Sequence, residues 1–244
     1  MILTHYFPPL QQGEYISKRN LFTTITEYND SEQTNLAKHL SHYPGRALHR
    51  FELFDDYINR RCQTEIWLYY SFLHIGGKPK SPHPFYFVLG KSKQLKKDFG
   101  KGAMELILDT EQIDSQSISF TLGDSIGVYF STALKRIYSL EEITVISSNK
   151  DFIQEQMVPL NVYHHYVEAQ LWDKQYLENA TISIDYPLET FFFNSLLVFP
   201  LDFKSCSAKI EISATYFLIN DQVDQVDFGY NILYNFIYKF CYRW

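Results

Sequence analysis

The chain has 244 residues, of which 45% are hydrophobic and 20% are charged, and its formal net charge is -6 at pH 7. This composition excludes an intrinsically disordered chain and is typical of a globular protein with one substantial core. The acidic balance excludes a surface coated with phosphate-binding residues, because non-specific nucleic-acid affinity comes mainly from lysine and arginine.

The N-terminal segment predicts a short strand at residues 2–7, ILTHYF, which Pro8 and Pro9 end because proline cannot donate to a sheet ladder. The segment has neither a basic region nor a long apolar stretch, so we expect no signal peptide. The three cysteines are widely spaced and odd in number, which favours a reducing compartment. We therefore expect a cytoplasmic protein.

A helix is predicted from residue 51 onward, because apolar residues recur there every three or four positions. The expected apolar stripe consists of Phe51, Phe54, Ile58, Cys62, Ile66, Tyr69 and Leu73. Gly76 and Gly77 end this helix.

Further strands are expected where short β-branched and aromatic runs occur, at residues 84–90, 104–110, 117–121 and 162–172. Residues 123–140 change to helical spacing, with Asp124 well placed to cap the N-terminus of a helix. Strands and isolated helices mix without regular alternation. The sequence therefore predicts the α+β class.

The C-terminal part is richer in apolar and aromatic runs. We expect residues 186–244 to be an extension that docks on a main domain of residues 1–185. Its aromatic run FGYNILYNFIYKF predicts an amphipathic helix that either docks on the core or contacts a partner or membrane surface. The most apolar run, FFFNSLLVFPL, is shorter than the ~20 residues that span a bilayer. We expect no transmembrane segment. The expected apolar face of the terminal helix consists of Phe228, Ile232, Phe236 and Phe240.

Several common catalytic sites are missing from the sequence. The GKS at Gly90 lacks the upstream glycine of a phosphate-binding loop, since Phe85 stands in its place. The histidines have no cysteine or carboxylate partners at ligand spacing, so we expect no metal site.

Four segments, taken in order, resemble the DarT family of nucleic-acid ADP-ribosyltransferase toxins. LTHYF resembles that family's opening strand with its histidine, and YINRRCQTEI resembles the arginine-bearing helix that grips NAD. PHPFYFVLG is similar to the family's P-F-Y-F strand. SFTLGDSIGVYFSTALKRI and YVEAQLWDKQYLENATI resemble the helix-opening motif and the strand with the catalytic glutamate. Two departures are Phe7, where the family often has threonine, and TLGD, where the family motif usually includes histidine.

The resemblance implies an ADP-ribosyltransferase-like fold, which is a split mixed or antiparallel sheet with flanking helices. It implies an NAD-dependent mono-ADP-ribosyltransferase of a bacterial or phage-defence toxin that modifies a base in single-stranded DNA or RNA, with NAD as a substrate. It also implies a neutralising antitoxin protein as a partner. Glu168 would be catalytic, and His5, Arg61 and Arg60 would contact NAD.

The residues themselves allow a second interpretation of each position. On an alternating strand Glu168 shares a face with Tyr166 and Gln170, which either lines a cleft or is simply solvated. Arg61 offers the bidentate fork that a pyrophosphate needs, whereas Arg60 projects further toward solvent. The alternative for Arg61 is a salt bridge on the helix surface to Glu65.

The remaining candidates concern the acceptor. Tyr86 either stacks on a ligand or packs in the core. In the basic segment GKSKQLKKDFGKG, Lys93, Lys96 and Lys97 are expected to bind phosphates of a single-stranded nucleic acid, unless the segment is an ordinary solvated face. Two other functions stay open: ADP-ribosylation of a protein, and a non-catalytic interaction module that binds a partner through the C-terminal tail.

Overall fold

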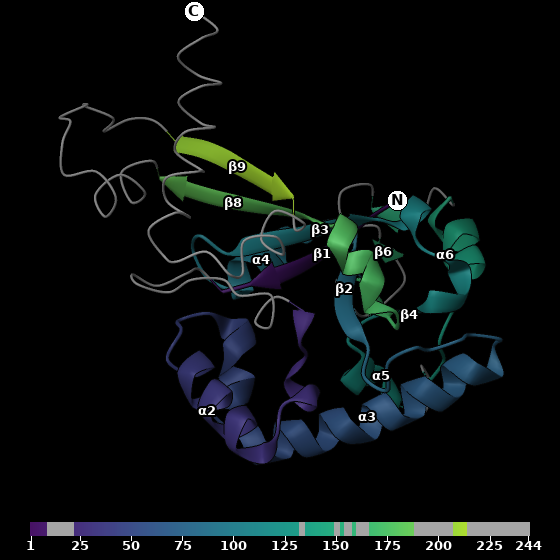
Figure 1. Ribbon diagram of the computed structural model, residues 1–244, viewed down its shortest axis with the longest axis horizontal. Coiled ribbons are helices and arrows are strands. Elements are labelled where there is room, and N and C mark those ends of the chain that lie inside the picture. The colour runs from purple at the N-terminus through teal and green to yellow at the C-terminus, as the bar shows by residue number, and fades with distance from the viewer. Residues whose placement is uncertain are drawn as a thin grey trace, which may run out of the picture.

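The computed structural model describes residues 1–8, 22–131, 135–148, 152–153, 158–159, 166–187 and 207–213. Their main feature is a seven-stranded sheet in which every pairing is antiparallel (Figure 1). In order across the sheet, the strands are β4 (Ile118–Thr121), β7 (Glu168–Leu171), β2 (Phe85–Leu89), β1 (Ile2–Phe7), β3 (Met104–Asp109), β8 (Thr181–Pro187) and β9 (Ser207–Ser213). A separate two-stranded sheet pairs β5 (Phe152–Ile153) with β6 (Val158–Pro159).

Helices surround this sheet, which agrees with the α+β class predicted from the sequence. The α-helices are α2 (Asp30–Leu40), α3 (Phe54–His74), α4 (Lys93–Asp98), α5 (Ser125–Phe130) and α6 (Leu140–Ser147). The 3-10 helices are η1 (Ile25–Glu27), η2 (Arg46–Phe51), η3 (Thr110–Gln112), η4 (Ser115–Ser117) and η5 (Lys174–Asn179). The strands expected at residues 2–7, 84–90, 104–110 and 117–121 are confirmed as β1, β2, β3 and β4. Of the strand expected at 162–172, residues 168–171 form β7.

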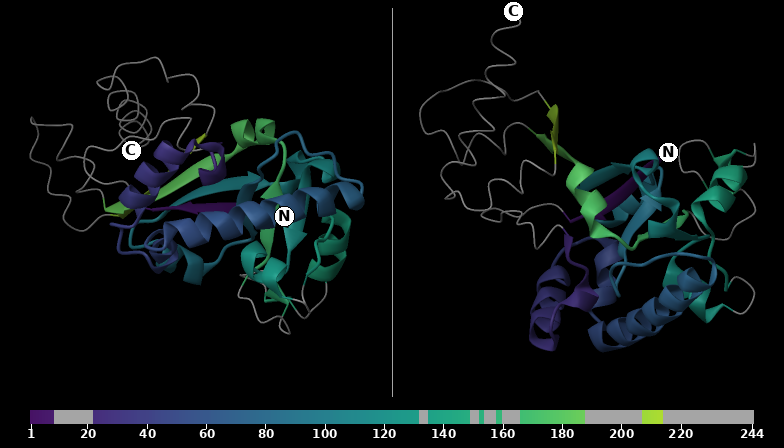
Figure 2. Two further views of the ribbon diagram at one scale, coloured as in Figure 1. Left: turned by 90° about the horizontal axis from the view of Figure 1, so that it is seen from below. Right: turned by 45° about the vertical axis from the view of Figure 1, so that its right-hand side comes forward.

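The two faces of β7 carry different chemistry. Val167, Ala169 and Leu171 are fully buried in the main hydrophobic core, as the alternation predicts. Residues from α6 and η5 pack into the same core, so these elements cover that face of the sheet. The long helix α3 crosses the opposite face of the sheet (Figure 2). Its Leu68 and Phe72 pack there against Trp172.

Strands β1 and β2 pair over a short distance only. Leu3 pairs with Leu89 and Thr4 with Val88, and the pairing between β1 and β2 ends there. By contrast, β1 pairs with β3 along its full length, from Ile2 to Phe7. The sheet is therefore split beside the second half of β1.

The apolar stripe expected on α3 is wrong at three of its positions, whereas Phe54, Ile58 and Tyr69 are half-buried. Its members Cys62, Ile66 and Leu73 are exposed, with 60% of Ile66 and 44% of Leu73 accessible to solvent. The buried residues of α3 are instead Arg61, Thr64, Glu65, Leu68 and Phe72. Arg61 and Glu65 can be buried because they form hydrogen bonds with Ser125 and Tyr86 from other elements. These hydrogen bonds offset the cost of removing the polar groups from water.

The helix expected over residues 123–140 is too long. Asp124 does cap α5, since its Oδ1 accepts a hydrogen bond from the backbone N–H of Ile126 at 2.8 Å. The helix ends at Phe130, and Ser131 has an extended backbone. Farther along, Tyr138 pairs with Phe120 of β4 as an isolated bridge, which is a sheet contact that periodicity cannot reveal.

The boundary expected between residues 185 and 186 falls inside β8, and β9 from the expected extension pairs with β8 as an edge strand. The amphipathic helix expected around Phe228 lies outside the described residues. Within the described ranges, no helix has the length and hydropathy needed to cross a membrane.

Candidate functional site

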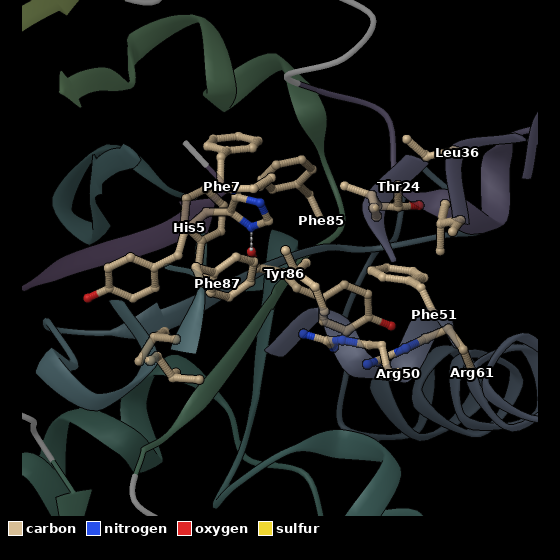
Figure 3. Close-up of a pocket in the computed structure, with 18 of the residues that line it drawn as sticks. His5, Phe7, Thr24, Leu36, Arg50, Phe51, Arg61, Phe85, Tyr86 and Phe87 are labelled. Carbon is tan, nitrogen blue, oxygen red and sulfur yellow. Dashed lines mark hydrogen bonds between the residues drawn. The ribbon is translucent and has the colours of Figure 1, made fainter. Parts of the chain in front are cut away.

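A cavity of about 620 Å³ lies beside the split in the sheet. Its walls come from β1, β2, α2, η2, α3 and α4, and Figure 3 shows ten of its residues labelled. This volume falls within the range of small-molecule sites in proteins. Three polar residues, Asp124, Tyr166 and Glu168, also line the cavity.

Glu168 is buried, with 6% of its surface exposed, so the interpretation as a solvated strand face is wrong. Its Oε1 accepts hydrogen bonds from the backbone N–H of Ser125 at 3.3 Å and from Nε2 of Gln170 at 3.2 Å. The first donor belongs to the opening turn of α5, which points its backbone N–H at this carboxylate. Strand β7 and helix α5 together hold Glu168 at the cavity wall.

A second carboxylate, Asp124, stands close enough to affect the charge of Glu168. Burial and the neighbouring Asp124 raise the pKa of Glu168 to about 7, against the opposing effect of Arg61 and the hydrogen bonds. Burial also opposes the charge of Asp124, but Arg61, Arg50 and the backbone N–H groups of α5 lower its pKa overall. Near neutral pH, Asp124 is therefore ionised, while the protonated and ionised forms of Glu168 are both populated. Divergent pKa values of this kind occur in acid–base sites.

Arg61 lies in the same cavity, as the sequence analysis expected for a cofactor contact, and it is 4% exposed. Its Nη1 donates to Oγ of Ser125 at 3.0 Å, and its guanidinium lies over the Tyr86 ring at 4.4 Å. Its Nε is buried without a hydrogen-bond partner. A buried cationic group with an unsatisfied donor is suited to bind an anion that enters the cavity.

Arg50 is a lining residue that sequence reasoning missed. The Tyr57 ring lies 5.6 Å from the Arg50 guanidinium and 5.9 Å from that of Arg61, so two cations share one region of the cavity (Figure 3). Arg50 follows a polar stretch without clear periodicity, and no sequence signal distinguishes it. Two arginines at one wall match the double negative charge of a pyrophosphate.

His5 lies where β1 leaves β2. Its Nδ1 makes a 2.6 Å hydrogen bond with the backbone carbonyl of Tyr86 (Figure 3). Burial lowers the pKa of His5 to about 4, so the ring is neutral, Nδ1 donates to that carbonyl and Nε2 is left as an acceptor. The rings of Phe7 and Phe85 lie 4.4 and 4.7 Å from the imidazole. His5 is thus on the opposite face of the sheet from Glu168, although both line the cavity.

Tyr86 is fixed by Glu65 rather than free to move. Its hydroxyl donates to Oε1 of Glu65 at 2.9 Å, and Nδ1 of His83 pairs with Oε2 of Glu65 at 2.7 Å. The alternative account of Arg61, a salt bridge to Glu65, is not what the structure contains, because Glu65 binds these two groups and Thr26 instead. Tyr86 therefore both packs and presents its ring face to Arg61.

Unlike Arg61, neither Arg60 nor the lysines of the basic segment line the cavity. Arg60 pairs with Asp56 at 3.7 Å and covers the Phe130 ring at 5.0 Å, outside the lining of the cavity. Lys96 binds Glu105 at 2.9 Å, and Lys91 binds the same carboxylate. Lys93 and Lys97 have exposed side chains on α4, whose Leu95 lines the cavity.

In the part of the chain that the structure describes, no group of three or more His, Cys, Asp or Glu side chains could hold a metal ion. Comparison with protein-family models found no match, and searches of curated proteins and of solved structures found no significant similarity.

Proposed function

We propose that this protein is an NAD-dependent mono-ADP-ribosyltransferase that modifies a base in single-stranded DNA or RNA. One observation carries the proposal: Glu168 and Arg61 line the same cavity and are both bonded to Ser125. Cleavage of the bond between nicotinamide and ribose requires negative charge near the ribose, and binding of NAD requires positive charge near its pyrophosphate. The resemblance of residues 1–185 to the DarT family supports the same chemistry.

Each residue has a defined task in this proposal. Glu168, as a carboxylate, stabilises the positive charge that develops on the ribose and then accepts the proton of the attacking base. Arg61 and Arg50 hold the pyrophosphate by charge-assisted hydrogen bonds. The Nε2 of His5 accepts a hydrogen bond from the nicotinamide or its ribose, which His5 reaches through the split in the sheet because it lines the same cavity as Glu168.

The fit of NAD rests on the residues already described. The partnerless Nε of Arg61 supplies a donor for a phosphate oxygen, and the cavity of about 620 Å³ has space for an extended ligand. Aromatic side chains along the wall, among them Phe51 and Tyr57, offer flat surfaces for a heterocyclic ring.

The acceptor strand would approach past α4. Lys93 and Lys97 on this helix are exposed, and the same helix borders the cavity through Leu95. Phosphate contacts of this kind fix the position of a strand without reading its sequence, while an unpaired base enters the pocket. An antitoxin that covers this entrance would neutralise the toxin, as the resemblance implies.

Transfer of a labelled ADP-ribose group tests this proposal. The full chain is incubated with NAD labelled in its adenylate part, together with single-stranded DNA, single-stranded RNA or a protein mixture. We expect label on one nucleic acid and none after Glu168→Gln. Label on protein alone would keep the transferase and replace the acceptor. Absence of both labelling and NAD binding would contradict the proposal and leave the non-catalytic interaction module.

A further inference from the structure

A chain of buried polar side chains leads from the interior of the protein to Glu168. Nε1 of Trp172 donates to Oγ of Ser119 at 2.9 Å, and this hydroxyl donates to Oε1 of Gln170 at 3.0 Å. Nε2 of Gln170 then donates to Oε1 of Glu168 at 3.2 Å. Trp172, Ser119 and Gln170 are completely buried, so no water competes for these bonds.

The direction of every bond in this chain is determined. The indole N–H of Trp172 can only donate, so the Ser119 oxygen accepts it and sends its single proton to Gln170. On the other side, the Thr121 hydroxyl donates to the backbone carbonyl of Gly123 at 2.9 Å. Thr121 therefore accepts from Nε2 of Gln170 at 3.0 Å. Both neighbours force the amide to present its NH₂ group, not its oxygen, to Glu168.

The orientation of this amide has a chemical consequence. An N–H donor stabilises the ionised form of a carboxyl group, whereas an amide oxygen would stabilise the protonated form. We propose that Gln170 is a positioning residue that favours the carboxylate form of Glu168 against the effects of burial and Asp124, and that Trp172, acting through Ser119, fixes the orientation of the Gln170 amide. The inference rests on the proposed function only for its activity readout.

Other groups around Glu168 also affect the balance between its protonated and ionised forms. Asp124 from the cap of α5 disfavours the carboxylate, and Arg61 from α3 favours it. Arg50 from η2 and Tyr166, which precedes β7, act on Asp124, because Arg50 lowers the pKa of Asp124 and the Tyr166 hydroxyl donates to its Oδ2 at 3.3 Å. Gln170 is coupled through hydrogen bonds to Trp172, whereas Arg61 contacts aromatic side chains through their ring faces.

That coupling runs through Trp172, whose ring stacks on Phe72 of α3 with centroids 5.4 Å apart and an interplanar angle of 13°. Phe72 offers a matched control, because Phe72→Leu weakens the packing of the indole but leaves every hydrogen-bond donor in place. Packing and hydrogen bonding can therefore be separated by experiment.

The first readout is the titration of the Glu168 carboxyl carbon by NMR, assigned with Glu168→Gln, and it requires no NAD. In Gln170→Met we expect the midpoint to rise by roughly one pH unit, since one hydrogen bond to the carboxylate is lost. Ser119→Ala and Trp172→Phe do not touch Glu168, yet both should shift the midpoint in the same direction by less. Phe72→Leu should leave it unchanged.

The second readout is the pH profile of nicotinamide release. In Gln170→Met the limb that reports Glu168 should move to higher pH by the same amount, with the KM for NAD unchanged. A folded Gln170→Met whose carboxyl titrates like the native protein would overturn the inference, and so would an equal shift in Phe72→Leu. If Gln170→Met does not fold, Ser119→Ala carries the same test. If NAD is never cleaved, the proposed function fails while the titration still decides this inference.

Discussion

Arg61 and Glu168 are joined through one residue, Ser125, whose hydroxyl accepts a 3.0 Å hydrogen bond from Arg61 and whose backbone N–H donates to Glu168 at 3.3 Å. The cation and the carboxylate are thereby held near each other without a direct salt bridge. Each keeps part of its hydrogen-bonding capacity for a ligand. This arrangement differs from a structural ion pair, in which the two charges satisfy each other.

Replacement of Arg61 by lysine should weaken NAD binding by at least roughly tenfold, because lysine cannot supply the bidentate fork at a buried site. Isothermal titration calorimetry with NAD measures the effect. Arg60→Lys is the matched control, since Arg60 is the preceding residue on the same helix but pairs with Asp56 outside the cavity. Equal losses of affinity in both variants would mean that Arg61 does not contact NAD.

Glu168→Gln should stabilise the folded protein at alkaline pH. The pKa of Glu168 is raised in the folded state to about 7, so its contribution to stability is present below its unfolded pKa and is lost as pH rises through about 7. A neutral amide avoids this loss. We expect the difference in the free energy of unfolding, variant minus native chain, to increase by about 2–4 kcal/mol as the pH rises from 4 to 8. Urea unfolding at the two pH values measures the difference, and a constant difference would contradict it.

His83→Gln should destabilise the protein in a manner that depends on pH. The hydrogen bond to Glu65 raises the pKa of His83, so its stabilising effect is present below the unfolded pKa and is lost as pH rises through the folded value. We expect a loss of about 1 kcal/mol at pH 5.5 and a smaller one at pH 9. Thermal unfolding compares the variant with His74→Gln, which changes an exposed histidine of α3. An equal loss at both pH values would exclude a charged pair.

The lysines of α4 should separate into two classes. Lys96→Gln should cost about 1 kcal/mol of stability, because buried Glu105 loses one of its two ammonium partners. Lys97→Gln should change stability by less than about 0.5 kcal/mol, because its side chain is exposed. In the proposed function, Lys93→Gln with Lys97→Gln should reduce the salt dependence of single-stranded DNA or RNA binding. An unchanged salt dependence would remove these lysines from the acceptor site.

Local patterns predicted much of the fold. Short β-branched and aromatic runs predicted β1, β2, β3 and β4, and alternation placed Val167, Ala169 and Leu171 in the core. Helical α2 and α6 were not predicted, because α2 is mostly polar and α6 is short. The orientation of α3 was wrong for a different reason. Periodicity assumes that apolar residues face inward, whereas this helix buries Arg61 and Glu65 in contact with groups from other elements.

The candidate site could be predicted only in part. The resemblance indicated His5, Arg61 and Glu168, and the structure places all three on one cavity. Arg50 had no local signal, since its role depends on the fold that brings η2 to the cavity. The chain from Trp172 to Glu168 depends on the register of β4 against β7, which pairs Ser119 with Gln170. The local pattern of a single sequence does not specify which residues of two distant strands pair with each other.

Nicotinamide release from NAD, measured with and without single-stranded DNA or RNA, tests the proposed transferase activity most directly. The native chain is compared with Glu168→Gln and with Glu111→Gln, which alters an exposed carboxylate of η3 in the same way. If the proposed function is correct, one nucleic acid stimulates the release, Glu111→Gln retains it and Glu168→Gln reduces it by at least roughly a hundredfold. Release that persists in Glu168→Gln would contradict the proposed function.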